Sequence, residues 1–238
     1  MLAPLTLKNN VIRIFLDCKR KQKKPAKCSI TAVKMIMGYK KRKRQILDIT
    51  ADMLWNIARH YRHIESLLNS QHYNVHAIAP HLNQWFTVYG INTELRAAHF
   101  IAQACVETAN FSRLTEVPRD GGREYDAGTR IGRNLGNTEV GDGPKFIGRG
   151  LLHLTGRENY TNFGSQFEKD YVTDPTIVAR NPYVAVKAAC YYWDLRHVNA
   201  AADRDDVNKV TLLVNGGYNG LEERKGALIR AKREFGII

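Results

Sequence analysis

Apolar residues recur at three- and four-residue steps over most of the chain beyond residue 50, which is the spacing of helices that bury one face. Thr50 or Asp52 can cap the first of these helices, and Gly90 can end the second because glycine tolerates the positive φ of a helix C-terminus. The expected helical ranges are 53–68, 75–89, a segment from 93 that stops between 107 and 116, a start at 159–163, then 182–195, 206–214 and 221–235.

The pattern changes between Glu116 and Gly150, where Gly, Asp, Asn, Arg and Pro replace the periodic apolar residues. A connection of this length inside a compact domain usually carries function. Alternating strand patterns are scarce throughout the sequence. The fold is therefore expected to be mostly α, with one long glycine-rich loop.

Positive charge is concentrated at the start of the chain. Residues 1–50 contain 14 Lys+Arg and only two acidic residues, whereas residues 51–238 contain 22 Lys+Arg and 21 Asp+Glu. The net charge of +13 therefore does not indicate a basic protein as a whole. We predict a cationic N-terminal extension, 1–48, followed by one helical domain, 49–238.

The extension has two interpretations. It is either a solvated tail without a role of its own or a segment that binds an anionic surface through its lysines and arginines. Nucleic acid is the less favoured partner, since Tyr39 is the only aromatic residue beside the basic clusters that could stack on bases.

The predicted helix that begins near residue 93 carries a polar row at four-residue steps: His99, Gln103 and Glu107. The row carries a single charge, which favours the wall of a cleft over an ordinary solvent face. Glu116 follows nine positions after Glu107. In a continuous helix it would lie on the opposite side and about 13 Å further along. The helix must therefore stop near Asn110 if the two carboxylates are to face one another, as they do in glycoside hydrolysis.

Three ordered blocks of sequence carry a resemblance to a known family. Together they resemble the family 19 glycoside hydrolases, which include chitinases and many phage endolysins that cut bacterial peptidoglycan. The compact endolysin-like branch is the more similar one, and the resemblance covers about residues 75–235. It implies a lysozyme-like helical domain. The blocks are HFIAQACVETANFSRLTE, GREYDAGTRIGRNLGNTEVGDGPKFIGRGLLHLTGRENY and VNGGYNGLEER.

The resemblance implies catalytic roles for three residues. Glu107 matches the general acid of the family, in a motif that reads V-E-T here, and Glu116 matches the general base. Thr155, in HLTG, resembles the Ser or Thr that helps to hold the attacking water. The implied reaction is a single inverting displacement that requires neither a metal nor an organic cofactor.

Further residues are expected to bind the sugar chain. Asn215 and Arg224 resemble the pair that orders the carboxylates or the sugar, and Tyr160 resembles a substrate-contacting tyrosine. His153 stands where the family usually has Gln. His99 and Gln103 join this set as the polar row beside Glu107. Arg149 and Arg157 are candidates for holding acidic groups of a wall polymer, with a surface ion pair as the alternative reading.

The expected activity is an endolysin-type hydrolysis of β-1,4 bonds between amino sugars of peptidoglycan. The alternatives are a chitinase, an antibacterial effector muramidase, and a wall-binding module without activity. The expected partners are peptidoglycan and, through residues 1–48, an anionic envelope surface such as lipopolysaccharide, membrane or teichoic acid, and the chain is expected to be a monomer. Without a recognisable signal peptide or an apolar run of 18 residues, we expect synthesis in the host cytoplasm and action on the cell wall or in the periplasm.

Overall fold

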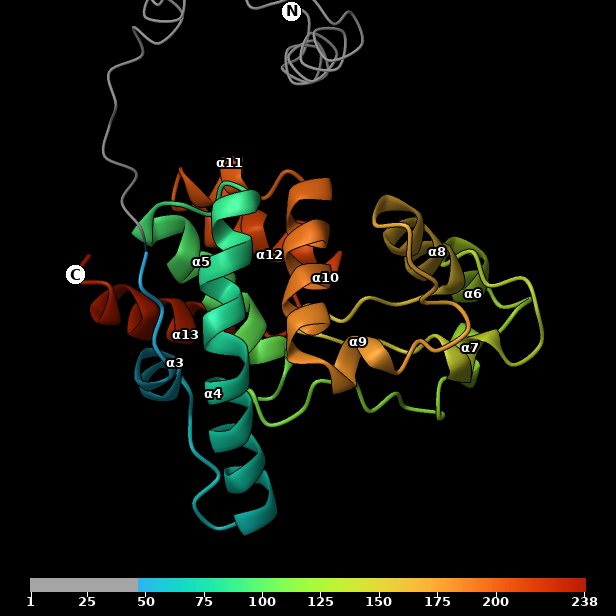
Figure 1. Ribbon diagram of the computed structural model, residues 1–238, viewed down its shortest axis with the longest axis horizontal. Helices are drawn as coiled ribbons and strands as arrows, with labels where there is room; N and C mark the ends of the chain where they lie inside the picture. Colours follow the sequence, from blue (N-terminus) through green and yellow to red (C-terminus); the bar gives the residue numbers. More distant parts are fainter. Residues whose placement is uncertain (1–46) are drawn as a thin grey trace, which may run out of the picture. The chain divides into compact units, whose positions relative to one another are not determined.

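The computed structural model describes residues 47–238, which belong to one compact, largely helical unit (Figure 1). Most of the predicted extension, 1–48, lies outside the described residues. The helices are α3 Ala51–Ile57, α4 Glu65–Val88, α5 Glu94–Glu107, the 3-10 turn η1 Arg123–Tyr125, α6 Arg130–Asn134, α7 Asp142–Lys145, α8 Arg157–Gln166, α9 Ile177–Arg180, α10 Pro182–Leu195, α11 Asn199–Ala202, α12 Val207–Asn215 and α13 Leu221–Glu234.

Side-chain caps fix the helix starts that the sequence predicts. The Thr50 hydroxyl accepts a hydrogen bond from the backbone N–H of Met53, and Thr93 caps α5 in the same way through Arg96. Asn181 caps α10, where Pro182 occupies the first turn and needs no hydrogen-bond partner for its nitrogen. The mostly helical fold and the bounds of α10 are confirmed.

The prediction of one helix over 53–68 is wrong. The chain leaves α3 after Ile57 and begins α4 only at Glu65. In between, the backbone is held by side chains: Asn110 accepts a hydrogen bond from the N–H of Arg59, and Gln71 accepts one from Tyr61. These tertiary hydrogen bonds replace the helical ones, so the apolar spacing alone could not show the break.

The apolar residues form two clusters. In the larger one, α13 packs along α5 and α10 packs on α4. The rings of Phe86, Phe100 and Trp193 join these helices through edge-on and tilted contacts. The smaller cluster is built around Phe163 of α8. In Figure 1, α6, α7 and α8 lie to one side of the larger helices. The long segment that follows Glu116 thus builds a second, smaller part of the same unit.

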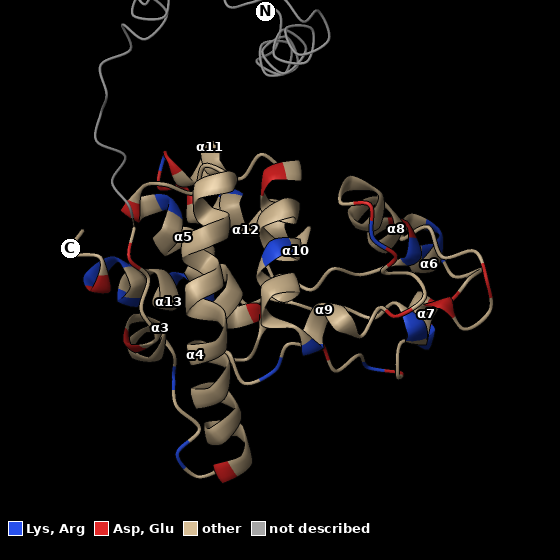
Figure 2. Cartoon of the chain, in the orientation of Figure 1, with Lys and Arg blue, Asp and Glu red and all other residues tan. Residues whose placement is uncertain are grey.

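Charges of both signs are interspersed over the described residues, as the near-neutral composition of 51–238 predicts (Figure 2). No helix among residues 47–238 is long and apolar enough to cross a bilayer. Nor do these residues bring three potential metal-binding side chains (His, Cys, Asp or Glu) together.

The buried carboxylate of Asp142 anchors the 116–150 segment. It accepts hydrogen bonds from the backbone of Thr138 and Glu139 and from both Nε and Nη2 of Arg157. Arg157 is therefore occupied by ion pairs, one with the buried Asp142 and one with the exposed Glu139, of which only the second is the surface ion pair that the alternative interpretation expected. Arg149 is also occupied, since its guanidinium donates to the carbonyl of Lys145 and to the Tyr160 hydroxyl. Neither arginine is free to hold an acidic group of a substrate.

Stability between pH 4 and pH 2 is expected to depend on Asp142. Burial opposes its ionisation, but the hydrogen bonds from Arg157 and the backbone outweigh this and lower the pKa of Asp142 to about 2. Because the folded pKa lies below the unfolded value near 3.9, the stabilisation is present above about pH 4 and is lost as the pH falls toward 2. We expect Asp142→Asn to lower the free energy of unfolding by about 2 kcal/mol at pH 7 in urea titrations.

The control for this prediction is Glu139→Gln, which removes the exposed partner of Arg157 and should change stability by less than about 1 kcal/mol. The Asp142→Asn protein should also lose much less stability than the wild type between pH 4 and pH 2. Parallel losses in the two proteins over that range would contradict the assignment.

Candidate active site

A cleft of about 330 Å³ lies between the two parts of the described unit. Its floor and walls combine two carboxylates with hydroxyl, amide and apolar side chains. The lining residues are Glu107, Glu116, Tyr125, Ile131, Leu135, Leu152, His153, Leu154, Thr155, Asn159, Tyr192, Val214 and Asn215.

Glu107 is the last residue of α5, and its side chain is 14% exposed. Its Oε1 accepts a hydrogen bond from Nη2 of Arg224 at 2.6 Å. Arg224 is buried in α13, where Nη1 donates to Gln103 and Nε donates to the carbonyl of Asn219. This network fixes the direction of the Glu107 carboxyl while leaving Oε2 toward the cleft.

His153 lies beside that second oxygen, with 3.6 Å between its Nδ1 and Oε2 of Glu107. Its backbone adopts a left-handed φ of 49°. Burial lowers the pKa of His153, and the charges of Glu107 and Glu116 only partly oppose this. The ring is therefore neutral at neutral pH. Its Nε2 is buried and has no hydrogen-bond partner within residues 47–238.

Three consecutive residues in the left-handed region turn the chain after Glu107. Ala109, Asn110 and Phe111 have φ values of 48°, 59° and 63°. This conformation costs a non-glycine residue roughly 1–2 kcal/mol. The helix thus stops where the sequence argument required, and the following residues can carry Glu116 back to the cleft.

Glu116 is held by the segment that precedes α8. Thr115 pairs with Arg149, and the N–H of Glu116 donates to the carbonyl of Gly148 at 2.9 Å. The carboxylate accepts hydrogen bonds from the N–H of Gly148 and, at 3.4 Å, from the hydroxyl of Tyr125. A Cβ on Gly148 would lie 3.0 Å from Cδ of Glu116, so only glycine allows this approach without displacing the carboxylate.

Five of the predicted site residues therefore line one cleft: Glu107, Glu116, His153, Thr155 and Asn215. The Thr155 hydroxyl donates to the carbonyl of His153, which leaves its lone pairs available. Oδ1 of Asn215 is buried without a hydrogen-bond partner in the described part of the chain. A further predicted site residue, Arg224, does not line the cleft but orients the carboxyl group of Glu107, which does.

The polar row on α5 does not reach the cleft, contrary to the prediction for His99 and Gln103. Both side chains are fully buried. Nε2 of His99 lies 2.8 Å from Asp205, and Gln103 donates to Thr211 while it accepts from Arg224. Elements distant in sequence cover this face of the helix, so its polar residues form their hydrogen bonds inside the protein and do not contact a sugar. Nδ1 of His99 is buried and has no partner among residues 47–238.

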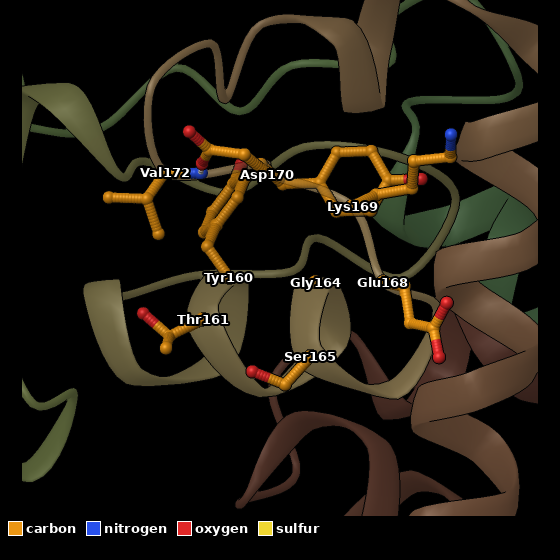
Figure 3. Close-up of a pocket in the computed structure, with 9 residues that line it drawn as sticks. Tyr160, Thr161, Gly164, Ser165, Glu168, Lys169, Asp170 and Val172 are labelled. Carbon is orange, nitrogen blue, oxygen red and sulfur yellow. Dashed lines mark hydrogen bonds between the residues drawn. The ribbon is translucent and has the colours of Figure 1, made fainter.

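The predicted sugar contact of Tyr160 also differs from the structure. Tyr160 is fully buried, and its hydroxyl donates to the carbonyl of Ile147. It lines a separate pocket of about 350 Å³ beside α8, together with Ser165, Lys169 and Val172 (Figure 3). The tyrosine belongs to the smaller apolar cluster, where its ring packs on Phe146, and it does not line the cleft.

Sequence reasoning missed three polar residues of the cleft: Tyr125, Asn159 and Tyr192. Burial and the nearby charge of Glu116 raise the pKa of Tyr125 to about 12, so the phenol is protonated and donates to Glu116. Asn159 follows HLTG closely and could have been found from the start of α8. Tyr192 lies on the apolar helix α10, where nothing in the local pattern marks a cleft residue.

The cleft thus presents a carboxyl group fixed by an arginine and a second carboxylate fixed by backbone N–H and a phenol. Oε2 of Glu107 faces the neutral ring of His153, and the hydroxyl of Thr155 lines the same cleft. A proton donor and a proton acceptor that share one solvent-open cleft can perform acid–base hydrolysis without a metal.

Comparison with known proteins identifies the family to which the chain belongs. The model of the chitinase class I family matches residues 71–209. A glycosyl hydrolase family 19 domain-containing protein from Haemophilus influenzae is 40% identical over 89 residues, which cover 37% of this chain and 42% of that protein. An acidic endochitinase from Petunia hybrida is 32% identical over 96 residues, covering 40% and 34%. The matches thus span less than half the length of these relatives.

Solved structures agree at the level of the fold. Chitinase C from Streptomyces griseus superimposes with a TM-score of 0.55 at 19% identity, covering 75% of this chain and 94% of that one. A bacterial family 19 chitinase superimposes with a TM-score of 0.51 at 16% identity, covering 80% and 96%. Because the family model spans more than half of the sequence and the fold agrees, the chain belongs to glycoside hydrolase family 19 and is a glycoside hydrolase.

Proposed function

We propose that this glycoside hydrolase cleaves β-1,4 bonds between the amino sugars of bacterial peptidoglycan, as endolysins do. One observation carries the proposal: Glu107 and Glu116 line the same cleft but are fixed by different parts of the chain, α13 and the 146–155 segment. Such a pair can flank a single glycosidic bond.

In the proposed mechanism Glu107 is the general acid and Glu116 the general base. Glu107 donates a proton to the glycosidic oxygen as the bond to the anomeric carbon breaks. Glu116 takes a proton from a water molecule that attacks that carbon from the opposite face, and the Thr155 hydroxyl holds this water. One displacement inverts the configuration at the anomeric carbon. Asn215 and His153 line the cleft, where their side chains border the bound sugar.

The charge of the N-terminal residues supports an envelope polymer as the substrate. Residues 1–50 carry a net charge of +12, from 14 Lys+Arg and two Asp. A cationic segment gains little on an uncharged polymer, whereas the bacterial envelope is anionic. Each basic residue near such a surface contributes about 1 kcal/mol at low salt. We propose that residues 1–48 bind this surface; a chain lacking them should clear intact cells less well at low salt, and equal clearing would refute this role.

Chitin is the second candidate, and two observations favour it. The curated plant relatives are named endochitinases, and no lysine or arginine lines the cleft within the described residues to receive the carboxylates of the stem peptides of peptidoglycan. Chitin is uncharged and would not need such a cation.

The test compares the two polymers directly. Purified peptidoglycan and chito-oligosaccharides are incubated with the protein and with Glu116→Gln as the inactive control, and the products are identified by mass spectrometry. We expect wall fragments with new reducing ends, and the sugar that carries the new end identifies the bond that is cut. Cleavage of chito-oligosaccharides alone would replace the proposal with the chitinase assignment. Walls that bind the protein but stay intact would indicate a binding module.

A further inference from the structure

The left-handed turn at 109–111 lies within the segment that connects Glu107 to Glu116. Within it, the hydroxyl of Thr108 accepts from the N–H of Phe111, and the N–H of Arg113 donates to the carbonyl of Thr108. These local hydrogen bonds close the turn. Together with the N–H of Asn110, which donates to the carbonyl of Cys105 at 2.6 Å, they fix the turn to the end of α5, but they do not provide its fixation to α4.

Two amide side chains of α4 provide that fixation. Nε2 of Gln71 donates to the carbonyl of Asn110 at 2.8 Å, and Nδ2 of Asn74 donates to the carbonyl of Phe111 at 2.7 Å. The two acceptors are consecutive carbonyls in the middle of the strained turn. Gln71 and Asn74 are three residues apart on one helix, so both project from the same face of α4.

Gln71 is fully buried and uses both ends of its amide. Besides the turn, its Nε2 donates to the carbonyl of Arg59, and its Oε1 accepts from the N–H of Tyr61. Asn110 completes the ring by accepting from the N–H of Arg59. The turn, the α3–α4 connection and α4 are therefore joined through one buried side chain, which touches neither carboxylate and does not line the cleft.

We propose that Gln71, assisted by Asn74, is a positioning residue that sets the geometry of the catalytic pair by clamping the left-handed turn between Glu107 and Glu116. A strained backbone persists only where its surroundings determine it, and here the buried amides do so. An inverting pair must keep a separation that admits one water molecule beside the sugar. A shift of the turn changes that separation, because α5 ends at Glu107 and the turn begins two residues later.

The first test is Gln71→Met, which keeps the length of the side chain and removes its hydrogen bonds. On the polymer that the wild type cleaves, we expect kcat to fall about 10- to 100-fold with KM changed less than about twofold, because the change displaces the pair without removing a sugar contact. Gln84→Met, at an exposed position of the same helix, is the matched control and should leave both constants unchanged. A kcat of Gln71→Met within twofold of the wild type would overturn the proposal.

A second variant separates positioning from stability. Glycine reaches the left-handed region without steric conflict, so Ala109→Gly should restore part of the thermal stability that Gln71→Met loses. We expect kcat of the double variant to remain low, since a relaxed turn is still not held in place. Recovery of kcat in parallel with the melting temperature would show that Gln71 only supports folding.

Hydrogen exchange provides a readout that does not depend on activity. The inference rests on the proposed roles of Glu107 and Glu116, and exchange distinguishes failure of those roles from failure of the clamp. In Gln71→Met, the amides of Asn110 and Arg113 should exchange at least about tenfold faster than in the wild type and in Gln84→Met. Unchanged protection would refute the clamp, even if the wild type cleaves neither polymer.

Discussion

Glu107→Gln is expected to abolish hydrolysis while leaving the fold intact. Glutamine has the same shape, and its Oε1 can still accept the hydrogen bond from Arg224 that holds Glu107 at 2.6 Å. The amide cannot donate a proton to a leaving oxygen as a carboxylic acid does, so the bond must break without general acid assistance. Because general acid–base groups contribute about 10²–10⁴-fold, kcat on the polymer that the wild type cleaves should fall at least about 10³-fold.

The measurement is release of new reducing ends, with the melting temperature determined on the same preparations. The variant should melt within a few degrees of the wild type. Glu65→Gln, an exposed glutamate at the start of α4, is the control for the loss of one negative charge and should retain full activity. If Glu107→Gln keeps more than a tenth of the wild-type rate, Glu107 is not the acid and the mechanism proposed above is wrong.

Three of the helix starts were predictable because their determinants are local. Thr50, Thr93 and Asn181 each bond to a backbone N–H two or three residues away, and such a pair of positions is visible in the sequence. The end of α5 was predictable for another reason. The chemistry required two carboxylates in one cleft, and a helix that continued past Asn110 would have separated them.

The partners of the polar row on α5 could not be predicted in this way. His99, Gln103 and Glu107 do lie along one face, as their four-residue spacing indicates, but only Glu107 reaches the cleft. The groups that cover the other two, Asp205 and Thr211, come from segments about 100 residues further along the chain. A periodic pattern identifies a face and not what packs on it.

The same limit applies to Gln71, because nothing in the sequence distinguishes it from the other polar residues of a helix. Its three hydrogen bonds go to the backbone of Arg59, Tyr61 and Asn110. Backbone N–H and carbonyl groups are nearly the same in every residue, so the sequence does not show which of them will bind a buried amide. The interrupted helix over 53–68 and the clamped turn are thus one feature of the fold, because the same amide satisfies both backbone segments.

Arg224→Met is expected to affect both stability and activity. The buried guanidinium donates to Glu107, Gln103 and the carbonyl of Asn219, and all three acceptors lose their partner in the variant. Removing one member of a buried ion pair costs about 3–5 kcal/mol. Since Glu107 is 14% exposed and water can partly replace the arginine, we expect a loss near the lower end, about 3 kcal/mol, in the free energy of unfolding measured with urea.

Activity of Arg224→Met should fall at least about 100-fold even under conditions where the protein is folded, because the carboxyl of Glu107 is no longer aimed at the bond. Arg224→Lys should not restore it, since an ammonium group cannot reproduce the planar set of donors that reaches Gln103 and Glu107 together. Arg233→Met, at an exposed position of the same helix, is the control and should change stability by less than about 0.5 kcal/mol. A wild-type urea midpoint for Arg224→Met would mean that the network around Glu107 contributes little, and the carboxyl would then be oriented by His153 and the helix end alone.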